Sequence, residues 1–286
     1  MKQAPTSNSE KHSQIRGLLK RSTFEAPSLH SIVDEVFFTT LGGAFNVRAL
    51  AERIQQDEIL TGAILEICRK PYYSGKTPIR NMNQVIHRLG PQGLRAVSLQ
   101  AFLDLEIYTA DTWEAQLKQL RTYSVIVAQI CKIIGRYCAI DGDDAFTTGL
   151  LHRIGFAVGL RKLTPKGDDN HAFWEALELS HTVFGKMVLQ EWGMPENIQT
   201  NVAHYGQTIV NNDVNLYCCA VLVAEELARR FRFEFRGQTR NKDSAVHQMT
   251  DSAHRAIELM EIDENMMRKI YMDARFVLAH GLRLNV

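Results

Sequence analysis

Apolar residues recur every three or four positions along most of this chain, which is the spacing of one buried face of an α-helix. The pattern predicts a nearly all-α protein without an internal repeat. The predicted helices cover residues 10–21, from 27 to the Gly42-Gly43 break, from 46 to about 54, 59–68, 81–89, 91–105, 113–137, 145–155, a helix just after 155, 171–179, 182–192, 195–206, 216–227, and two helices within 244–283 that separate near Asp263.

Turn and cap residues separate these helices. Gly90 is a poor helix former, and Pro91 is tolerated only in the first turn of the helix that follows. Asn46 is expected to cap the next helix, and residues 141–143, Asp-Gly-Asp, indicate a turn and a cap. A further break is expected near Ser180-His181, where His181 could cap a helix end.

Residues 145–160, AFTTGLLHRIGFAVGL, carry the most unusual chemistry. Their apolar spacing predicts one helix that ends at Gly155 and a second that begins directly after it. Gly149 lets another backbone approach closely, and Gly155 can adopt the positive φ that ends a helix. His152 and Arg153 lie inside this apolar run. A polar ring and a guanidinium need partners there, so the stretch is a candidate functional site.

Residues 230–236, RFRFEFR, alternate with a period of two and indicate a short strand or an extended loop. Three phenylalanines interleave with a basic cluster in this region. The cluster comprises Arg229, Arg230, Arg232, Arg236, Arg240 and Lys242. It could form a nucleic-acid surface that uses phosphate contacts and base stacking. We favour a connector with inward phenylalanines and solvated arginines, because three nearby glutamates dilute the charge.

Composition narrows the function further. The chain has 286 residues, 45% of them hydrophobic, and a formal net charge of +1, so no global charge favours nucleic acid or an anionic membrane. The five cysteines lack CxxC spacing, the N-terminus is polar, and no window is apolar for long enough to span a bilayer. We expect a cytoplasmic protein without a membrane association. Gly-rich phosphate loops and a GxSxG elbow are absent from the sequence.

Three blocks of sequence carry a family resemblance. Residues 50–99 include LAERIQQDEILTGAIL and PYYSGKTPIRNMNQVIHRLGPQGLRAVSL, residues 145–155 read AFTTGLLHRIG, and residues 181–205 read HTVFGKMVLQEWGMPENIQTNVAHY. In order and spacing the chain resembles an HDOD domain, the output-type relative of the HD metal-dependent phosphohydrolases, over about residues 24–230. The resemblance implies a multi-helical bundle with an N-terminal lobe and an HD-like lobe. It also implies a bacterial signalling role, for which hydrolase activity is generally not demonstrated.

The resemblance and a polar boundary at residues 109–112 together predict four regions. They are a polar tail with a short helix at 1–23, the N-terminal helical lobe at 24–110, the HD-like lobe at 111–236, and C-terminal helices packed on the body at 237–286.

The resemblance also assigns positions in an HD-type site, where histidines and carboxylates hold one or two cations and bound water becomes the nucleophile. The matching positions here are Tyr123, the pair His152-Arg153, His181, His204, Tyr205 and, in the place of a late aspartate, Glu225. Arg153 replaces an anionic ligand with a cation that cannot lose its proton. Two unit charges at contact repel by about 4 kcal/mol at an effective dielectric of 20, and a divalent ion doubles that. We therefore expect no catalytic residue and no metal; if iron, manganese or zinc is bound, the ligands are His152, His181 and His204.

These residues also have simpler interpretations. The histidines could be hydrogen-bonded structural residues, and Arg153 could pair with a nearby Asp or Glu. A third interpretation turns the metal pocket into an anion pocket, in which Arg153 and the histidines hold a phosphate or a carboxylate.

The sequence therefore leaves several functions open. The first is a non-catalytic regulatory protein with a degenerate HD site that binds a protein partner or a small anionic ligand. The alternative is a metal-dependent phosphohydrolase that acts on a nucleotide or a phosphoester. A third, nucleic-acid-associated regulator would use the basic cluster, and we do not expect it.

Overall fold

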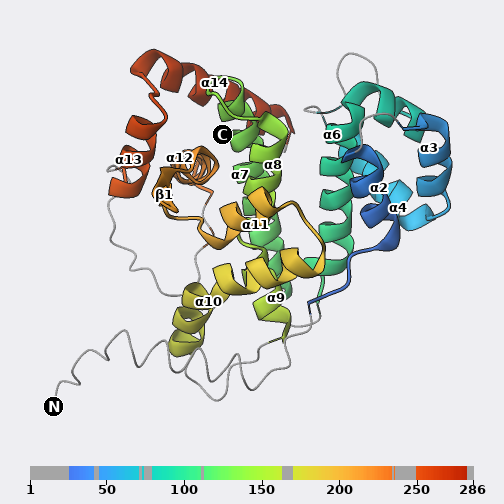
Figure 1. Cartoon of the computed structure of the whole chain (residues 1–286), viewed down its shortest axis with the longest axis horizontal. Helices are drawn as coiled ribbons and strands as arrows, with labels where there is room; N and C mark the ends of the chain where they lie inside the picture. Colours follow the sequence, from blue (N-terminus) through green and yellow to red (C-terminus); the bar gives the residue numbers. More distant parts are fainter. Residues whose placement is uncertain are drawn as a thin grey trace.

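The computed structural model describes residues 26–41, 45–70, 73, 79–110, 113–162, 170–233, 235 and 249–281. These residues form a helical protein with one short hairpin, whose two strands have two residues each (Figure 1). This architecture confirms the predicted all-α class. The helices are α2 (Ser31–Leu41), α3 (Val47–Gln55), α4 (Glu58–Cys68), α6 (Met82–Phe102), the π-helix η1 (Leu103–Ile107), α7 (Glu114–Gly135), α8 (Gly142–Leu151), α9 (Ile154–Lys162), α10 (Asn170–Glu191), α11 (Glu196–Ala203), α12 (Leu216–Arg230), α13 (Asp251–Leu259) and α14 (Glu264–Gly281).

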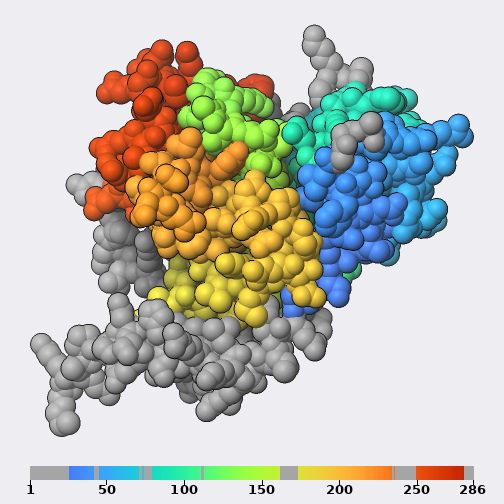
Figure 2. Space-filling view, viewed as in Figure 1, coloured from blue at the N-terminus to red at the C-terminus, as the bar shows by residue number. Residues whose placement is uncertain are grey.

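Two groups of helices lie side by side. Helix α6 packs against α2, α3 and α4, while α7 packs against α8, α12 and α14. The groups meet where α6 contacts α8 and where the indole N–H of Trp192 donates to the carbonyl of Pro27 at 2.6 Å. Trp192 also packs edge-on against Phe102 at 5.4 Å between ring centroids. The space-filling view shows the blue N-terminal helices in direct contact with the yellow part of the chain (Figure 2).

Several predicted caps are confirmed. The side chain of Asn46 accepts hydrogen bonds from the backbone N–H groups of residues 48 and 49, and Asp141 caps α8 in the same way. Gly90 has a φ of 66° at a kink inside α6, so this helix consists of two helical pieces joined at Gly90-Pro91, as the sequence predicts.

Gly155 plays a different role from the predicted one. Helix α8 already ends at Leu151, and Gly155 lies inside α9. A Cβ atom on Gly155 would overlap the carbonyl oxygen of His181 and lie 2.7 Å from the backbone nitrogen of Gly185. This glycine therefore permits close packing of α9 on α10. Gly149 does allow the close approach expected of it, because a Cβ there would lie 2.8 Å from the Cα of Ala128.

The predicted break at Ser180-His181 is wrong. Helix α10 runs unbroken through both residues, because the Ser180 hydroxyl donates to the carbonyl of Ala176 at 2.7 Å and so needs no partner outside the helix. His181 is thus a mid-helix residue and caps nothing. The first described helix also starts later than expected, at Ser31 instead of near Pro27.

The RFRFEFR segment forms no strand over the residues that the structure describes. Helix α12 extends through Arg230, and Phe231 and Phe235 are buried while Arg232 is exposed. Arg229 and Arg230 both pair with the buried carboxylate of Glu226. Inward phenylalanines agree with the connector interpretation. Arg236, Arg240, Lys242 and the predicted helix at 10–21 lie outside the described residues.

Helical periodicity missed a hairpin. Strands β1 (Ile209–Val210) and β2 (Asp213–Val214) pair antiparallel across Asn211 and Asn212. Both asparagines have positive φ, which is typical of a tight hairpin turn. Among the described residues, no helix has both the length and the apolar content to cross a bilayer.

Candidate functional site

Most of the predicted site residues meet around the turn between α8 and α9. That turn carries His152 and Arg153, α7 supplies Tyr123, α10 supplies His181, and α12 supplies Glu225. Two glycine contacts create the convergence, since Gly149 brings α8 onto α7 and Gly155 brings α9 onto α10. Tyr205 follows the end of α11 and adds a ring to the same cluster.

One carboxylate oxygen connects this cluster. Glu225 Oε1 accepts a hydrogen bond from the Tyr123 hydroxyl at 2.8 Å. The Nε and Nη2 atoms of Arg153 each donate to the same oxygen at 3.3 Å. His152 Nε2 lies 3.4 Å from it, at the limit of hydrogen-bonding reach. Glu225 therefore joins three helical segments that are distant in sequence.

Aromatic rings enclose the guanidinium of Arg153. Its Cζ lies 5.8 Å from the ring centroid of Tyr123, 5.4 Å from that of Tyr205 and 5.3 Å from that of Phe156. Phe235 closes the enclosure at 6.0 Å. Such contacts stabilise a cation through the negative faces of the rings. Only 12% of the Arg153 side chain is exposed, so the residue acts as an internal cation.

The charges of the pair support each other. Burial alone would raise the pKa of the Glu225 carboxyl, but the positive charge of Arg153, the neighbouring His152 and the hydrogen bond from the Tyr123 hydroxyl lower it to about 2. Burial would lower the pKa of Arg153, yet the neighbouring Tyr205 and Glu225 raise it above its usual value. The site thus holds one buried ion pair whose charges cancel.

The two buried histidines behave differently from each other. His152 Nδ1 lies 2.6 Å from the carbonyl oxygen of Gly149, which favours the tautomer with its proton on Nδ1. Burial, together with the positive charge of Arg153, lowers the pKa of His181 well below its usual value, so this ring is neutral at neutral pH. His152 Nε2 and His181 Nδ1 are buried without a hydrogen-bond partner among the described residues.

These residues do not fit an HD-type metal centre. Across the part of the chain that the structure describes, no group of three or more His, Cys, Asp or Glu side chains is arranged to hold a metal ion. The carboxylate that would bind a cation is already paired with Arg153, and a divalent ion beside that guanidinium would be repelled. Two imidazoles with one unpartnered nitrogen each are what the residues retain of such a site.

The remaining predicted residue is His204. It ends α11 with its backbone N–H bonded to the carbonyl of Thr200, and within the described residues its side chain forms no hydrogen bond or ion pair with the cluster. The structure also adds three residues that sequence reasoning missed, one of which is Phe156, whose ring lies 5.3 Å from the Arg153 guanidinium. Glu178 Oε2 lies 3.8 Å from Arg153 Nη1, and Phe235 covers the guanidinium.

Comparisons with known proteins place this geometry in context. A family profile described as HDOD domain matches residues 26–208. No curated protein matches the chain. Among solved structures, an HDOD domain protein with unknown function from Geobacter sulfurreducens aligns with a TM-score of 0.69 and 16% identity, over 97% of this chain and 100% of that one.

Two further structures share the fold. One is named "Putative metal-dependent phosphohydrolase" and comes from Shewanella amazonensis SB2B; its TM-score is 0.68 at 16% identity, over 94% of this chain and 97% of that one. The other is named "Putative signal transduction protein" and comes from Marinobacter aquaeolei VT8; its TM-score is 0.65 at 12% identity, over 98% of this chain and 66% of that one. At these identities the likeness establishes the fold alone.

Proposed function

The chain belongs to the HDOD family, and from this premise we propose that it is a regulatory protein that does not hydrolyse phosphoesters and acts by binding a protein partner or a small anionic ligand. The observation that carries the proposal is the buried pair of Arg153 and Glu225. In an HD-type site, an acidic residue at the position of Arg153 would help to hold a metal cation. Here the guanidinium of Arg153 itself supplies the positive charge.

The ion pair removes the chemistry that hydrolysis requires. An HD-type reaction uses a metal ion to lower the pKa of bound water. Guanidinium is a cation too, but it has only N–H donors and no vacant coordination position for water. With Glu225 neutralised by Arg153, the pocket also lacks a free carboxylate that could serve as general base.

The same pairing argues against an anion site built on Arg153. A phosphate would have to replace Glu225 as the partner of a guanidinium that is enclosed by four aromatic rings. Breaking a buried ion pair is costly because it leaves a charge without compensation. If the protein binds a small anion, we expect the anion to contact other cations.

A metal-dependent phosphohydrolase remains the second candidate. The unpartnered nitrogens of His152 and His181 favour it, because buried polar atoms without a partner are rare and suit a ligand. It requires Arg153 to leave Glu225, so that the carboxylate and both imidazoles could face one ion.

Hydrolysis assays separate the two candidates. Untagged protein is assayed against nucleoside mono- and triphosphates and 4-nitrophenyl phosphate with Mg²⁺, Mn²⁺, Fe²⁺ or Zn²⁺. The proposal predicts no turnover above the metal-only blank. Turnover that follows metal concentration and is lost in His152→Ala, but kept in the matched control His204→Ala, would establish the hydrolase instead.

A further inference from the structure

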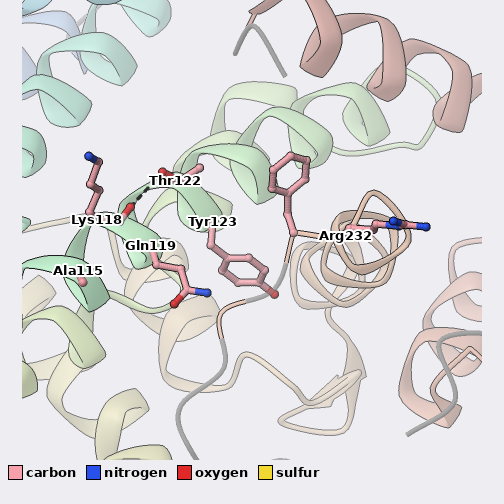
Figure 3. Close-up of a pocket in the computed structure, with 7 residues that line it drawn as sticks. Ala115, Lys118, Gln119, Thr122, Tyr123 and Arg232 are labelled. Atoms are coloured by element: carbon pink, nitrogen blue, oxygen red, sulfur yellow. Dashed lines mark hydrogen bonds between the residues drawn. The ribbon is translucent and has the colours of Figure 1, made fainter. Parts of the chain in front are cut away.

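A cavity of about 370 Å³ is lined in part by Tyr123, and its described lining includes neither Arg153 nor Glu225. Its described lining residues come from α7 and from the segment that follows α12. They are Ala115, Lys118, Gln119, Thr122, Tyr123, Arg232 and Phe233 (Figure 3). This volume falls in the usual range for sites that bind small molecules.

The charges of this lining have one sign. Lys118 and Arg232 are exposed, and neither forms an ion pair with a described residue. None of the described lining residues is acidic. The carboxylate that accepts the Tyr123 hydroxyl, Glu225, is already paired with Arg153. Two cations without an acidic residue among the described lining residues favour the binding of anions.

The lining also offers flat apolar surface. Tyr123 contributes the small exposed part of its ring, 7% of the residue, and its hydroxyl is bonded to Glu225, so the phenol cannot turn away without breaking that bond. Phe233 supplies a second ring. Figure 3 shows Gln119 and Tyr123 between Lys118 and Arg232, which stand at opposite ends of the row. The arrangement suits a ligand with a planar ring at the centre and a negative charge that the two flexible cations can reach when they turn inward.

The backbone holds one wall of the cavity in an unusual conformation. Arg232 has a φ of 64°, which few residues other than glycine adopt, and its carbonyl-side neighbour Phe233 donates its N–H to the carbonyl of Ala228 at 2.9 Å. Two residues further on, Phe235 covers Arg153. The segment that follows α12 therefore lines this cavity and also covers the guanidinium of Arg153.

We infer that this cavity binds a small planar aromatic anion, such as an aryl phosphate or an aryl carboxylate, between Tyr123 and Phe233 with Lys118 and Arg232 as counter-ions. The inference rests on the proposed function, since it locates the anionic ligand that a regulatory protein would sense. Both charged side chains point outward in Figure 3, so a ligand has to turn them inward, and moderate affinity is expected.

The test uses 4-nitrophenyl phosphate as the probe and calorimetry on the full-length protein. We expect a dissociation constant below about 1 mM, with 4-nitrophenol and inorganic phosphate each binding at least about tenfold more weakly, because each retains half of the contacts. Lys118→Glu and Arg232→Asn should each weaken binding by about tenfold. Asparagine tolerates positive φ, so the latter removes the charge without adding backbone strain.

The control is Arg48→Glu, which changes an exposed arginine on α3 that lies outside the cavity lining. Binding that is absent in the wild-type protein, or unchanged in both cavity variants, would overturn the inference. Release of 4-nitrophenolate in the same samples reports hydrolysis separately. Its appearance would refute the proposed function without affecting the binding result, and its absence leaves the binding result to decide the inference.

Discussion

Replacing Arg153 with methionine should destabilise the protein strongly. The substitution keeps a long apolar side chain among the aromatic rings but leaves the Glu225 carboxylate without its cation. The pKa of that carboxyl is about 2 in the folded protein against an ordinary 4.5. A difference of about 2.5 pKa units corresponds to about 3 kcal/mol of stability at neutral pH. The side chains are only 12% and 18% exposed, so solvent screening reduces this little.

The magnitude agrees with the general cost of breaking a buried pair, about 3–5 kcal/mol. For a chain of this length, a loss of about 3 kcal/mol lowers the melting temperature by about 6–12 °C. The assay is thermal and urea denaturation at pH 7, followed by circular dichroism. The double variant Arg153→Met with Glu225→Leu should recover most of the loss, because apolar groups then replace both charges.

The pH dependence provides the sharper test. A carboxyl with a lowered folded-state pKa contributes stability above pH 4.5, and this contribution is lost as the pH falls from 4.5 toward 2. In Arg153→Met the burial of Glu225 raises its pKa instead, so the difference between wild type and variant should shrink on acidification. An Arg153→Met protein within about 1 kcal/mol of wild type at pH 7 would refute the reasoning. So would a difference that does not change with pH.

Three other predictions concern the packing and protonation of the same region. Gly155→Ala should lower the free energy of unfolding by about 1–3 kcal/mol, because the new Cβ atom would overlap the carbonyl of His181. Gly62→Ala is the control: a Cβ atom there has nothing within 4 Å, so this variant should be neutral or more stable by up to about 1 kcal/mol. Equal melting temperatures for the two variants would contradict this prediction. Tyr123→Phe should cost about 1.5–3 kcal/mol in urea denaturation, since it removes a hydrogen bond to the charged Glu225, and a loss within experimental error would argue against that bond. The ring signals of His181 in NMR spectra should not titrate between pH 8 and pH 5.5, because burial and the charge of Arg153 lower the pKa of this ring. Since the unfolded chain takes up the proton at a higher pH than the folded protein, the stability of the fold should decrease as the pH drops below about 6.5. A titration midpoint near 6.5 in the folded protein would contradict the lowered pKa.

The sequence predicted the helical architecture well because apolar periodicity and cap residues act locally. Asn46 and Asp141 cap helices as expected, and the kink at Gly90-Pro91 follows from the conformational properties of those two residues. The errors arose where the residue type alone does not show which contact the residue makes. Gly155 resembles a helix terminator, but it serves the packing of α9 on α10. Ser180 resembles a break, but its hydroxyl bonds within the helix.

The functional site, too, could be predicted from the sequence only in part. The family resemblance singled out Tyr123, Arg153 and Glu225, and the chemistry of arginine already pointed to a lost metal ligand. What the sequence could not provide was the identity of the partner, because Arg153 and Glu225 lie 72 positions apart and several carboxylates could have met the guanidinium. Phe235 was equally hidden, since alternation in RFRFEFR predicts that a phenylalanine turns inward but not which side chain it covers.

Metal analysis of the wild-type protein tests the central claim most directly. Untagged protein is purified without chelator from cells grown with iron, manganese and zinc, and its metal content is measured by mass spectrometry. If the Arg153–Glu225 pair occupies the place of the HD-type metal site, each chain should carry far less than one metal ion. A stoichiometric ion that is lost in His152→Ala and retained in His204→Ala would show that the pair opens to admit a metal, and would contradict the account.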